Sequence, residues 1–351
     1  MQVDNNKNNN FVFLRLLLAT LVILAHSAEI LDQNRSREIL TNIFGTITFG
    51  ELAIDGFFLI SGYLILKSYL SSSTIKSYFL KRILRIYPGF IVASLFCIFV
   101  LLPLSGEIKL IIDMPLKEWF STIFRMITLD APQVANTQYA ALNGAMWSIW
   151  LEFVCYLCIP IVYITKFNKP KTYAILAVML LLIFLFTQVS GKNIWLPYVR
   201  LDLHHTSRLM FAFLIGGLFY LRRDKVIWNK KLTIICALLL LISLNFSYSA
   251  EVGLMTFGAY LLFNFALNYK NKFLSSIGAK VDISYGVYLY AWPVQIYVIK
   301  YFPQVNLYVL MLVTLIAASI LGYLSWTFVE KPFIQLKGKL DFNVRNTAIK
   351  L

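Results

Sequence analysis

The chain has 351 residues, of which 59% are hydrophobic and 14% charged, and it carries a net charge of +15. Soluble domains are about 45–50% apolar and about 25% charged, so this composition excludes an ordinary soluble enzyme. The positive charge would suit nucleic acid, but the basic residues form short clusters between apolar runs, which argues against that partner. The composition predicts an all-α, polytopic integral membrane protein.

Ten apolar runs are candidates for helices that cross a membrane. They cover residues 11–31, 48–66, 83–104, 145–165, 172–189, 207–221, 232–248, 252–269, 282–301 and 307–329. All four cysteines lie inside these runs, so neither a disulfide framework nor a zinc site is expected. We expect no metal centre and no tightly bound cofactor.

The distribution of Lys and Arg predicts the orientation of these spans. With a cytoplasmic N-terminus, 23 of the 32 Lys and Arg residues fall in segments on the cytoplasmic side. The expected organisation is a polar cytoplasmic N-terminus (1–10), a transmembrane domain (11–329) and a cytoplasmic tail (330–351), in the inner membrane of a bacterium. Because Arg15 interrupts the first apolar run, we expect that run to be retained rather than cleaved as a signal peptide.

The longest external segment, 105–143, carries Trp119, Phe120 and Phe124 among charged residues. It could lie on the outer membrane surface as an amphipathic stretch, or fold as a lid over an outward-facing site. Its neighbour at 190–206 is rich in aromatic residues and histidine. Both interpretations of 105–143 stay open.

Ionisable residues inside a bilayer are costly, so each is a candidate functional residue. His26, Asp55 and Glu152 come from three different spans and are expected at similar depth below the outer surface. Ser148, Glu152 and Tyr156 are spaced four residues apart, which places them on one face of their helix. This shared depth predicts a polar site in the outer half of the membrane.

A second group of polar residues is basic and is expected at the cytoplasmic surface. Arg15 precedes His26 by eleven residues, so the two project from one helix face and lie about 16 Å apart along the axis. Arg82 and Arg85 are three residues apart on a helix and could together bind phosphate groups. An elongated donor with phosphates at one end and a reactive group at the other would span this distance, and acyl-coenzyme A is such a molecule.

The chain resembles the acyltransferase-3 family of membrane acyltransferases over nearly its whole length. The motifs that carry the resemblance are a basic residue separated from a histidine by ten residues, FFxxSG, RxxR, Trp-Ser-x-x-x-Glu and SYxxYLxxxP. They read here as Arg15 to His26, Phe57 to Gly62, Arg82 to Arg85, Trp147 to Glu152 and Ser284 to Pro293. Many members have a histidine in the last motif where this chain has Ala291.

The resemblance implies transfer of an acyl group, usually acetyl, from cytoplasmic acyl-CoA to a hydroxyl of a carbohydrate such as a surface polysaccharide or its lipid-linked precursor. Arg15, Ser61, Arg82 and Arg85 are then the expected residues for binding acyl-CoA. No esterase-like domain follows the last span, so the chain is expected to act alone or to recruit a partner.

In this interpretation His26 is a general base that removes the proton of the acceptor hydroxyl. Asp55 or Glu152 would hold its tautomer and stabilise the imidazolium, and the sequence does not choose between them. An acyl-histidine intermediate is the competing mechanism. The rival function is a transporter of a sugar or a lipid-linked glycan, which also accommodates buried charges. The acceptor, the acyl chain and the oligomeric state are not specified by the sequence.

Overall fold

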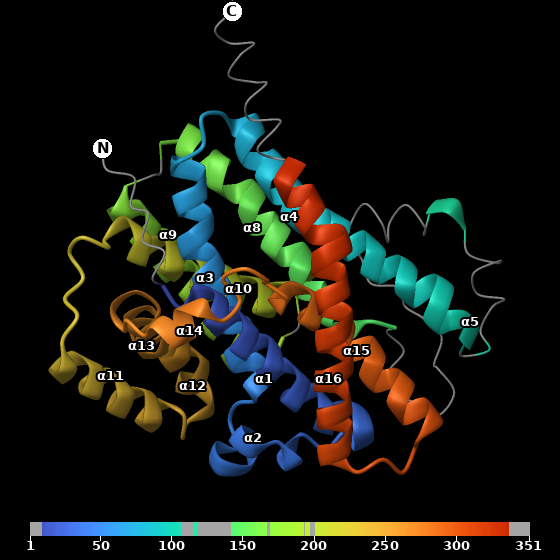
Figure 1. The fold of residues 1–351 in the computed structure, drawn as a ribbon. Helices are drawn as coiled ribbons and strands as arrows, with labels where there is room; N and C mark the ends of the chain where they lie inside the picture. The colour runs from blue at the N-terminus through green and yellow to red at the C-terminus, as the bar shows by residue number, and fades with distance from the viewer. Residues whose placement is uncertain are drawn as a thin grey trace, which may run out of the picture. The chain divides into compact units, whose positions relative to one another are not determined.

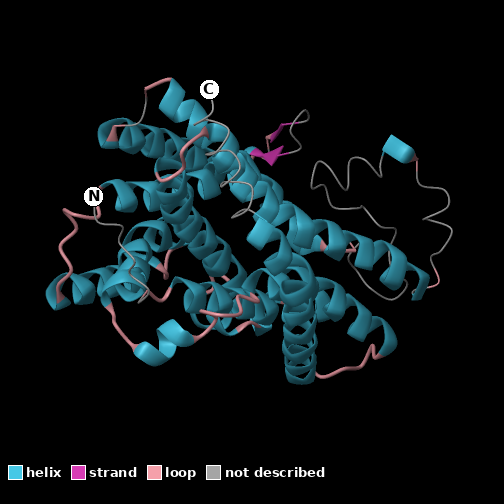
Figure 2. Ribbon diagram, turned by 45° about the horizontal axis from the view of Figure 1, so that its top comes forward, coloured by secondary structure: helices cyan, strands magenta, loops and turns pink. Residues whose placement is uncertain are grey.

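The computed structural model describes residues 9–104, 106, 115–117, 142–166, 169–192, 194–196 and 201–336 (Figure 1). Most of the predicted external segment 105–143, most of the N-terminal segment 1–10 and most of the tail 330–351 lie outside the described residues. Among those residues, helices are joined by short loops and accompanied by one pair of two-residue strands (Figure 2). The prediction of an all-α fold is confirmed.

Helices occupy the positions of all ten predicted spans, but they differ in length and apolarity. Seven helical stretches of the described chain are long and apolar enough to cross a membrane, and they cover 11–32, 49–70, 75–104, 144–164, 170–190, 247–268 and 307–336. Helix α11 (Lys230–Ser243), at the predicted span 232–248, has 14 residues, or about 21 Å against a hydrocarbon core of about 30 Å. A multi-pass membrane protein is supported, while the number ten and the orientation of the termini stay predictions.

The described helices form two compact units, each assembled from separate parts of the chain. Unit 1 comprises residues 1–22, 35–71 and 151–280. Its elements, in chain order, are the first half of α1 (Phe11–Asp32), η1 (Arg35–Arg37), α2 (Ile39–Phe44), α3 (Phe49–Leu70), most of α8 (Trp147–Ile164), α9 (Pro170–Ser190), β1 (Trp195–Leu196), β2 (Leu201–Asp202), α10 (Leu203–Leu221), α11, α12 (Ser247–Gly253), η4 (Leu254–Gly258), α13 (Ala259–Phe263), η5 (Asn264–Asn268) and α14 (Lys272–Ser276).

Unit 2 comprises residues 23–34, 72–150 and 281–351. Its elements are the second half of α1, α4 (Ile75–Phe96), η2 (Cys97–Leu101), α5 (Leu102–Leu104), η3 (Gly144–Met146), the first turn of α8, α15 (Ser284–Tyr301), α16 (Leu307–Ser325) and η6 (Trp326–Glu330). Two long helices, α1 and α8, therefore contribute residues to both units.

Helix α3 begins at a residue that the sequence marks clearly. Thr48 caps the helix by accepting a hydrogen bond from the backbone N–H of Glu51, and the Glu51 carboxylate accepts one from the backbone N–H of Thr48 at 2.8 Å. This reciprocal capping box satisfies two backbone donors that the first helical turn leaves free. It fixes the start of the helix that carries Asp55 and Ser61.

Two pairs of glycines let helices touch through their backbones. In unit 1, a Cβ on Gly62 of α3 would lie 1.9 Å from the carbonyl oxygen of Phe213 in α10, and a Cβ on Gly216 would lie 2.0 Å from that of Leu59. In unit 2, a Cβ on Gly286 of α15 would lie 2.6 Å from the Cα of Gly322 in α16. Small residues at helix contacts allow close packing where no hydrophobic driving force acts between helices.

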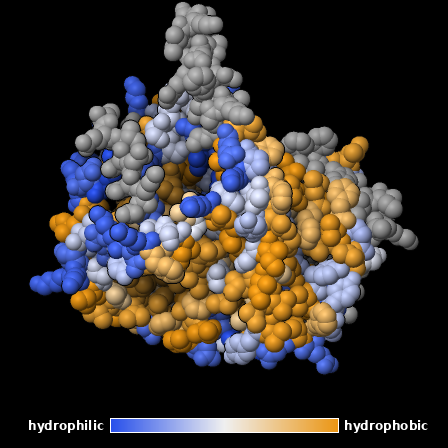
Figure 3. Space-filling view, viewed as in Figure 1, coloured by the Kyte–Doolittle hydropathy of each residue, from blue (hydrophilic) through white to orange (hydrophobic). Residues whose placement is uncertain are grey.

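The outward side of α16 is almost entirely apolar (Figure 3). Its exposed side chains include Val309, Leu312, Ile316 and Ile320, each at least half exposed. A contiguous apolar surface of this length is unfavourable in water but matches the acyl chains of a bilayer. The residues that point away from the neighbouring helices therefore face lipid.

Candidate active site

His26 lies in the second half of α1, within unit 2, and has a carboxylate beside it. Its Nδ1 is 3.4 Å from Oε2 of Glu29, one helical turn further along the same helix. The side chains of His26 and Glu29 are 20% and 16% exposed, so neither is sealed inside the protein. A histidine that is oriented by a carboxylate and still reachable has the arrangement needed for a general base.

The helix that carries His26 is held against α15 by a buried glutamine. Gln295 is fully buried, and its Nε2 donates to the carbonyl oxygen of Ile23 at 2.9 Å and to Oγ of Ser27 at 2.7 Å. The ring of Trp292, one turn earlier on α15, lies 4.8 Å from the imidazole of His26 and nearly perpendicular to it. Helix α15 thus packs directly against the part of α1 that carries His26.

Ser61 and Glu152, which the sequence assigned to different roles, meet in unit 1. The hydroxyl of Ser61 donates to Oε1 of Glu152, and so does the hydroxyl of Tyr156 at 2.5 Å. Glu152 and Tyr156 thus share one face of α8, as their spacing predicted. Ser148, the third residue of that stripe, hydrogen-bonds the hydroxyl of Tyr288 at 2.7 Å within unit 2.

Asp55 belongs to a buried ion-pair network in unit 1 that its sequence position did not reveal. Nε of Arg208 donates to its Oδ1 at 3.0 Å, and Nη1 of the same arginine is 2.6 Å from Oε1 of Glu251. Asp55 and Arg208 are 1% and 4% exposed. Arg208 thus engages one oxygen of Asp55, one of the two carboxylates predicted as candidate partners of His26, and it joins α3 to α10 and α12.

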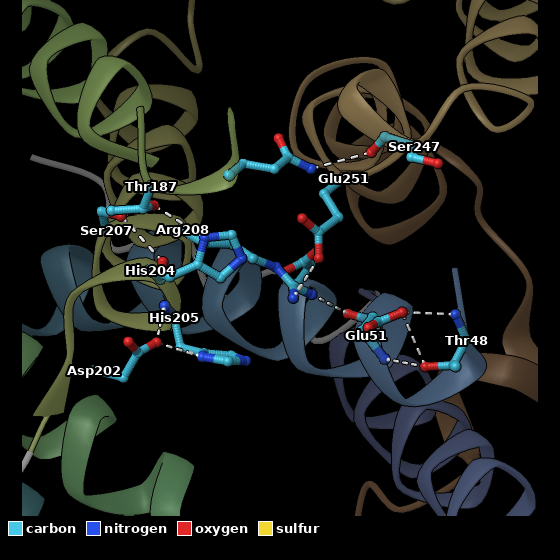
Figure 4. A network of polar contacts seen from close by, with 12 residues as sticks. Thr48, Glu51, Thr187, Asp202, His204, His205, Ser207, Arg208, Ser247 and Glu251 are labelled. Carbon is cyan, nitrogen blue, oxygen red and sulfur yellow. Dashed lines mark hydrogen bonds and ion pairs between the residues drawn. The ribbon is translucent and has the colours of Figure 1, made fainter. Parts of the chain in front are cut away.

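The two other histidines lie next to this network, at the start of α10 (Figure 4). Nδ1 of His204 is 3.0 Å from the hydroxyl of Thr187, and Nδ1 of His205 is 2.6 Å from Oδ2 of Asp202. Partial burial raises the pKa of the Asp202 carboxyl, but hydrogen bonds from the backbone and ring of His205 outweigh it and hold that pKa below its ordinary value. Asp202 caps α10 and stays ionised at neutral pH.

The arginine pair of the RxxR motif lies on α4 in unit 2. Arg85 is held by two carboxylates, with Nη2 2.9 Å from Oδ2 of Asp282 and Nη1 3.3 Å from Oε2 of the fully buried Glu330. Its guanidinium carbon also lies 5.9 Å from the ring centre of Tyr285. Arg85 therefore joins α4 to both ends of the C-terminal helix pair, a role that the motif alone does not indicate.

The structure thus brings some of the predicted site residues together and adds others. Ser61 is paired with Glu152, Asp55 with Arg208, and Arg85 with Asp282, while Arg15 shares the uninterrupted helix α1 with His26.

Glu29 was not predicted, although its position three residues after His26 on a helix is a sequence signal that could have identified it. Arg208 and Trp292 carry no such local signal, because their partners are far away in the chain. No group of three or more metal-ligating side chains occurs within the described ranges.

Comparison with known proteins identifies related chains along nearly the full length. The family model described as "Acyltransferase domain" matches residues 8–328. An O-acetyl transferase of Shigella phage Sf6 is 28% identical over 94% of this chain and 97% of its own length. Nodulation protein 10 of Rhizobium leguminosarum bv. viciae is 24% identical over 96% of each chain. No solved structure matches the chain.

Proposed function

This chain belongs to the acyltransferase domain family, and we propose that it is a membrane-bound O-acyltransferase that moves an acetyl group from acetyl-CoA to a hydroxyl of a carbohydrate. The similarity to a phage protein named O-acetyl transferase supports the acetyl group and the oxygen acceptor. The positive-inside distribution of Lys and Arg supports a donor bound from the cytoplasm, and we place the protein in the inner membrane of a bacterium. The acceptor is a surface polysaccharide or its lipid-linked precursor.

The observation that carries the proposal is the contact between His26 and Glu29. Glu29 accepts a hydrogen bond from Nδ1–H of His26, which leaves Nε2 as the basic nitrogen. Nε2 removes the proton of the acceptor hydroxyl while the alkoxide oxygen attacks the thioester carbonyl carbon. The C–O bond forms, the C–S bond breaks, and the imidazolium returns the proton to the departing thiolate of coenzyme A. Glu29 stabilises the imidazolium between these two transfers.

The donor is bound by basic residues away from His26. Arg15 lies eleven residues earlier on α1, about 16 Å along the helix axis. Arg82 is one turn from Arg85 on α4, and guanidinium groups bind phosphate oxygens in a bidentate manner. We assign Arg82 to the phosphates, and we assign Arg85, which binds Asp282 and Glu330, to the packing of α4 against the C-terminal helices. Ser61 is assigned to donor binding from its motif alone, and within unit 1 its hydroxyl donates to Glu152.

The test measures acyl transfer and sugar transport separately, both with the purified protein. An acyltransferase releases one free thiol of coenzyme A for each ester formed, and the release depends on the carbohydrate acceptor. Thiol release is followed with a thiol reagent and ester formation by mass spectrometry. A transporter would instead accumulate labelled sugar in proteoliposomes without consuming acetyl-CoA, and that result would contradict the proposal.

The same preparation distinguishes direct transfer from an acyl-histidine intermediate. Incubation with labelled acetyl-CoA in the absence of acceptor leaves no label on the protein if transfer is direct. Retention of label on the peptide that contains His26 would show instead that the imidazole is the nucleophile. We propose direct transfer, because the Glu29 contact orients the ring as a base.

A further inference from the structure

Trp292 is the aromatic residue that contacts the imidazole of His26. It lies on α15 and is 5% exposed, and its ring centre is 4.8 Å from that of His26 at an interplanar angle of 77°. Edge-to-face contacts of this kind have a preferred geometry, so they restrict the orientation of both rings. Both residues belong to unit 2.

A glycine lies on another side of the Trp292 indole and makes room for it. A Cβ on Gly144 would lie 2.5 Å from Cζ2 of Trp292 and 2.8 Å from its Cε2 and Cη2. Real Cβ atoms do not approach other atoms so closely, so any side chain at this position would displace the indole. Gly144 is therefore required for the space that it leaves rather than for its backbone conformation.

The turn that contains Gly144 is fastened to α15 by hydrogen bonds. Nδ2 of Asn143 donates to the carbonyl oxygen of Leu289 at 2.7 Å, and the hydroxyl of Tyr288 donates to the carbonyl oxygen of Ala145 at 2.6 Å. Gln295, further along α15, binds the backbone of α1 just before His26. The indole of Trp292 thus contacts η3 at Gly144 and α1 at His26, two elements that are each fastened to α15.

We propose that Trp292 is a positioning residue that fixes the imidazole plane of His26, and that Gly144 serves this role by admitting the indole. The inference rests on the proposed function of His26 as a base. The terminal torsion of a histidine is broad and nearly two-fold, so the 3.4 Å contact with Glu29 alone does not determine the plane of the ring. The indole ring restricts rotation of the imidazole and keeps Nε2 directed at the acceptor hydroxyl.

The kinetic test uses Trp292→Leu, Trp292→Phe and Gly144→Ala in the purified full-length protein. Because a displacement of about 1 Å can cost about a hundredfold in rate, we expect kcat to fall by about that factor in Trp292→Leu and Gly144→Ala. The KM for acetyl-CoA should stay within about threefold, and Trp292→Phe, which keeps an aromatic ring, should lose less. Matched controls are Trp228→Phe and Gly258→Ala, since a Cβ on Gly258 would meet no atom closer than 3.6 Å.

A spectroscopic readout tests the contact independently of activity. The Hε1–Cε1 resonance of His26, assigned by its absence in His26→Gln, is shifted by the ring current of the indole. Trp292→Leu and Gly144→Ala should both move this resonance, whereas the two controls should leave it in place. If His26→Gln still transfers acetyl groups, the proposed role of His26 as the base fails, while the resonance still decides whether Trp292 positions the ring.

Unchanged kcat together with an unchanged His26 resonance in folded Gly144→Ala and Trp292→Phe would overturn the positioning role. A rise in KM with kcat preserved would also overturn it, because it would place Trp292 in donor binding. Gly144→Ala keeps the native tryptophan, so it decides the question even if Trp292→Leu does not fold.

Discussion

At the scale of single residues, Glu29 is the carboxylate that the structure places beside His26, and its substitution gives the most specific test of the proposed proton transfer. The two side chains belong to one helix and lie 3.4 Å apart. Substitution of Glu29 by Gln removes the charge that stabilises the imidazolium, and its amide group can favour the wrong tautomer. We predict that kcat of Glu29→Gln falls by about 10²–10⁴ while the affinity for acetyl-CoA is unchanged.

Asp55→Asn is the informative comparison for Glu29→Gln. Asp55 is bound by Arg208 and is 1% exposed, so its loss weakens a buried ion pair. Such a loss costs about 3–5 kcal/mol when the remaining charge is left without a partner, and less here because Arg208 keeps Glu251. A large decrease in kcat for Asp55→Asn at normal thermal stability, with Glu29→Gln fully active, would transfer the orienting role to Asp55.

The two arginines of the RxxR motif should differ in their response to substitution. Arg82→Ala should weaken acetyl-CoA binding by about ten- to a hundredfold, because a charge-assisted hydrogen bond contributes about 1.5–3 kcal/mol. Arg82→Lys should restore only part of the affinity, since the planar fork is lost. Arg85→Ala should instead lower the melting temperature, because it leaves the Asp282 and Glu330 carboxylates without their arginine.

Binding titrations and thermal unfolding of the detergent-solubilised variants separate these two effects. Normal acetyl-CoA affinity in folded Arg82→Ala would show that this arginine does not bind the donor and only adds to the positive charge that sets the orientation of the span. Normal stability of Arg85→Ala together with lost binding would return Arg85 to the donor site.

At the scale of helices, the contact between α3 and α10 depends on glycines that leave no room for a side chain. A Cβ on Gly62 would come within 1.9 Å of a backbone oxygen, which cannot move aside as a flexible side chain could. We predict that Gly62→Ala separates the two helices and destabilises the protein by at least about 1–3 kcal/mol. Thermal unfolding measures the loss, with Gly258→Ala as a substitution of the same size at a position with space.

The close helix contact at Gly62 also gives a structural reason for the glycine of the FFxxSG motif, which would otherwise be interpreted only as a catalytic or binding element. The FFxxSG element contributes the hydroxyl of Ser61 to Glu152 and the bare backbone of Gly62 to a helix contact. A Gly62→Ala protein with unchanged stability and lost activity would contradict the packing role.

The positions of the helices could be predicted from the sequence, since continuous apolar runs have few alternatives to helix in a membrane. The run predicted at 11–31 matches α1 (Phe11–Asp32), and that predicted at 48–66 overlaps α3 (Phe49–Leu70) from its N-cap onward. The partner of Asp55 could not be predicted, because Arg208 is 153 residues away and nothing local specifies which helices touch. The contact of Glu29 with His26 could have been predicted from helical spacing alone.

At the scale of the whole molecule, the distribution of positive charge predicts which loops face the cytoplasm. Cysteines introduced singly at Lys225 and Lys117 of a variant without native cysteines should differ in labelling by a membrane-impermeant reagent added to intact cells. We predict labelling at 117 and none at 225, because the segment around 225 is basic and predicted to be cytoplasmic. Labelling at 225 but not at 117 would invert the orientation and with it the side from which the donor binds.

Acyl transfer by this protein should depend on His26, and one assay of the purified protein decides whether it does. Labelled acetyl-CoA and a carbohydrate acceptor are incubated with the wild-type protein, with His26→Gln and with His205→Gln, which alters an exposed histidine outside the proposed mechanism. We predict labelled ester from the wild type and His205→Gln, and none from His26→Gln although it binds acetyl-CoA normally. Ester formation by folded His26→Gln at a rate near that of the wild type would contradict this prediction.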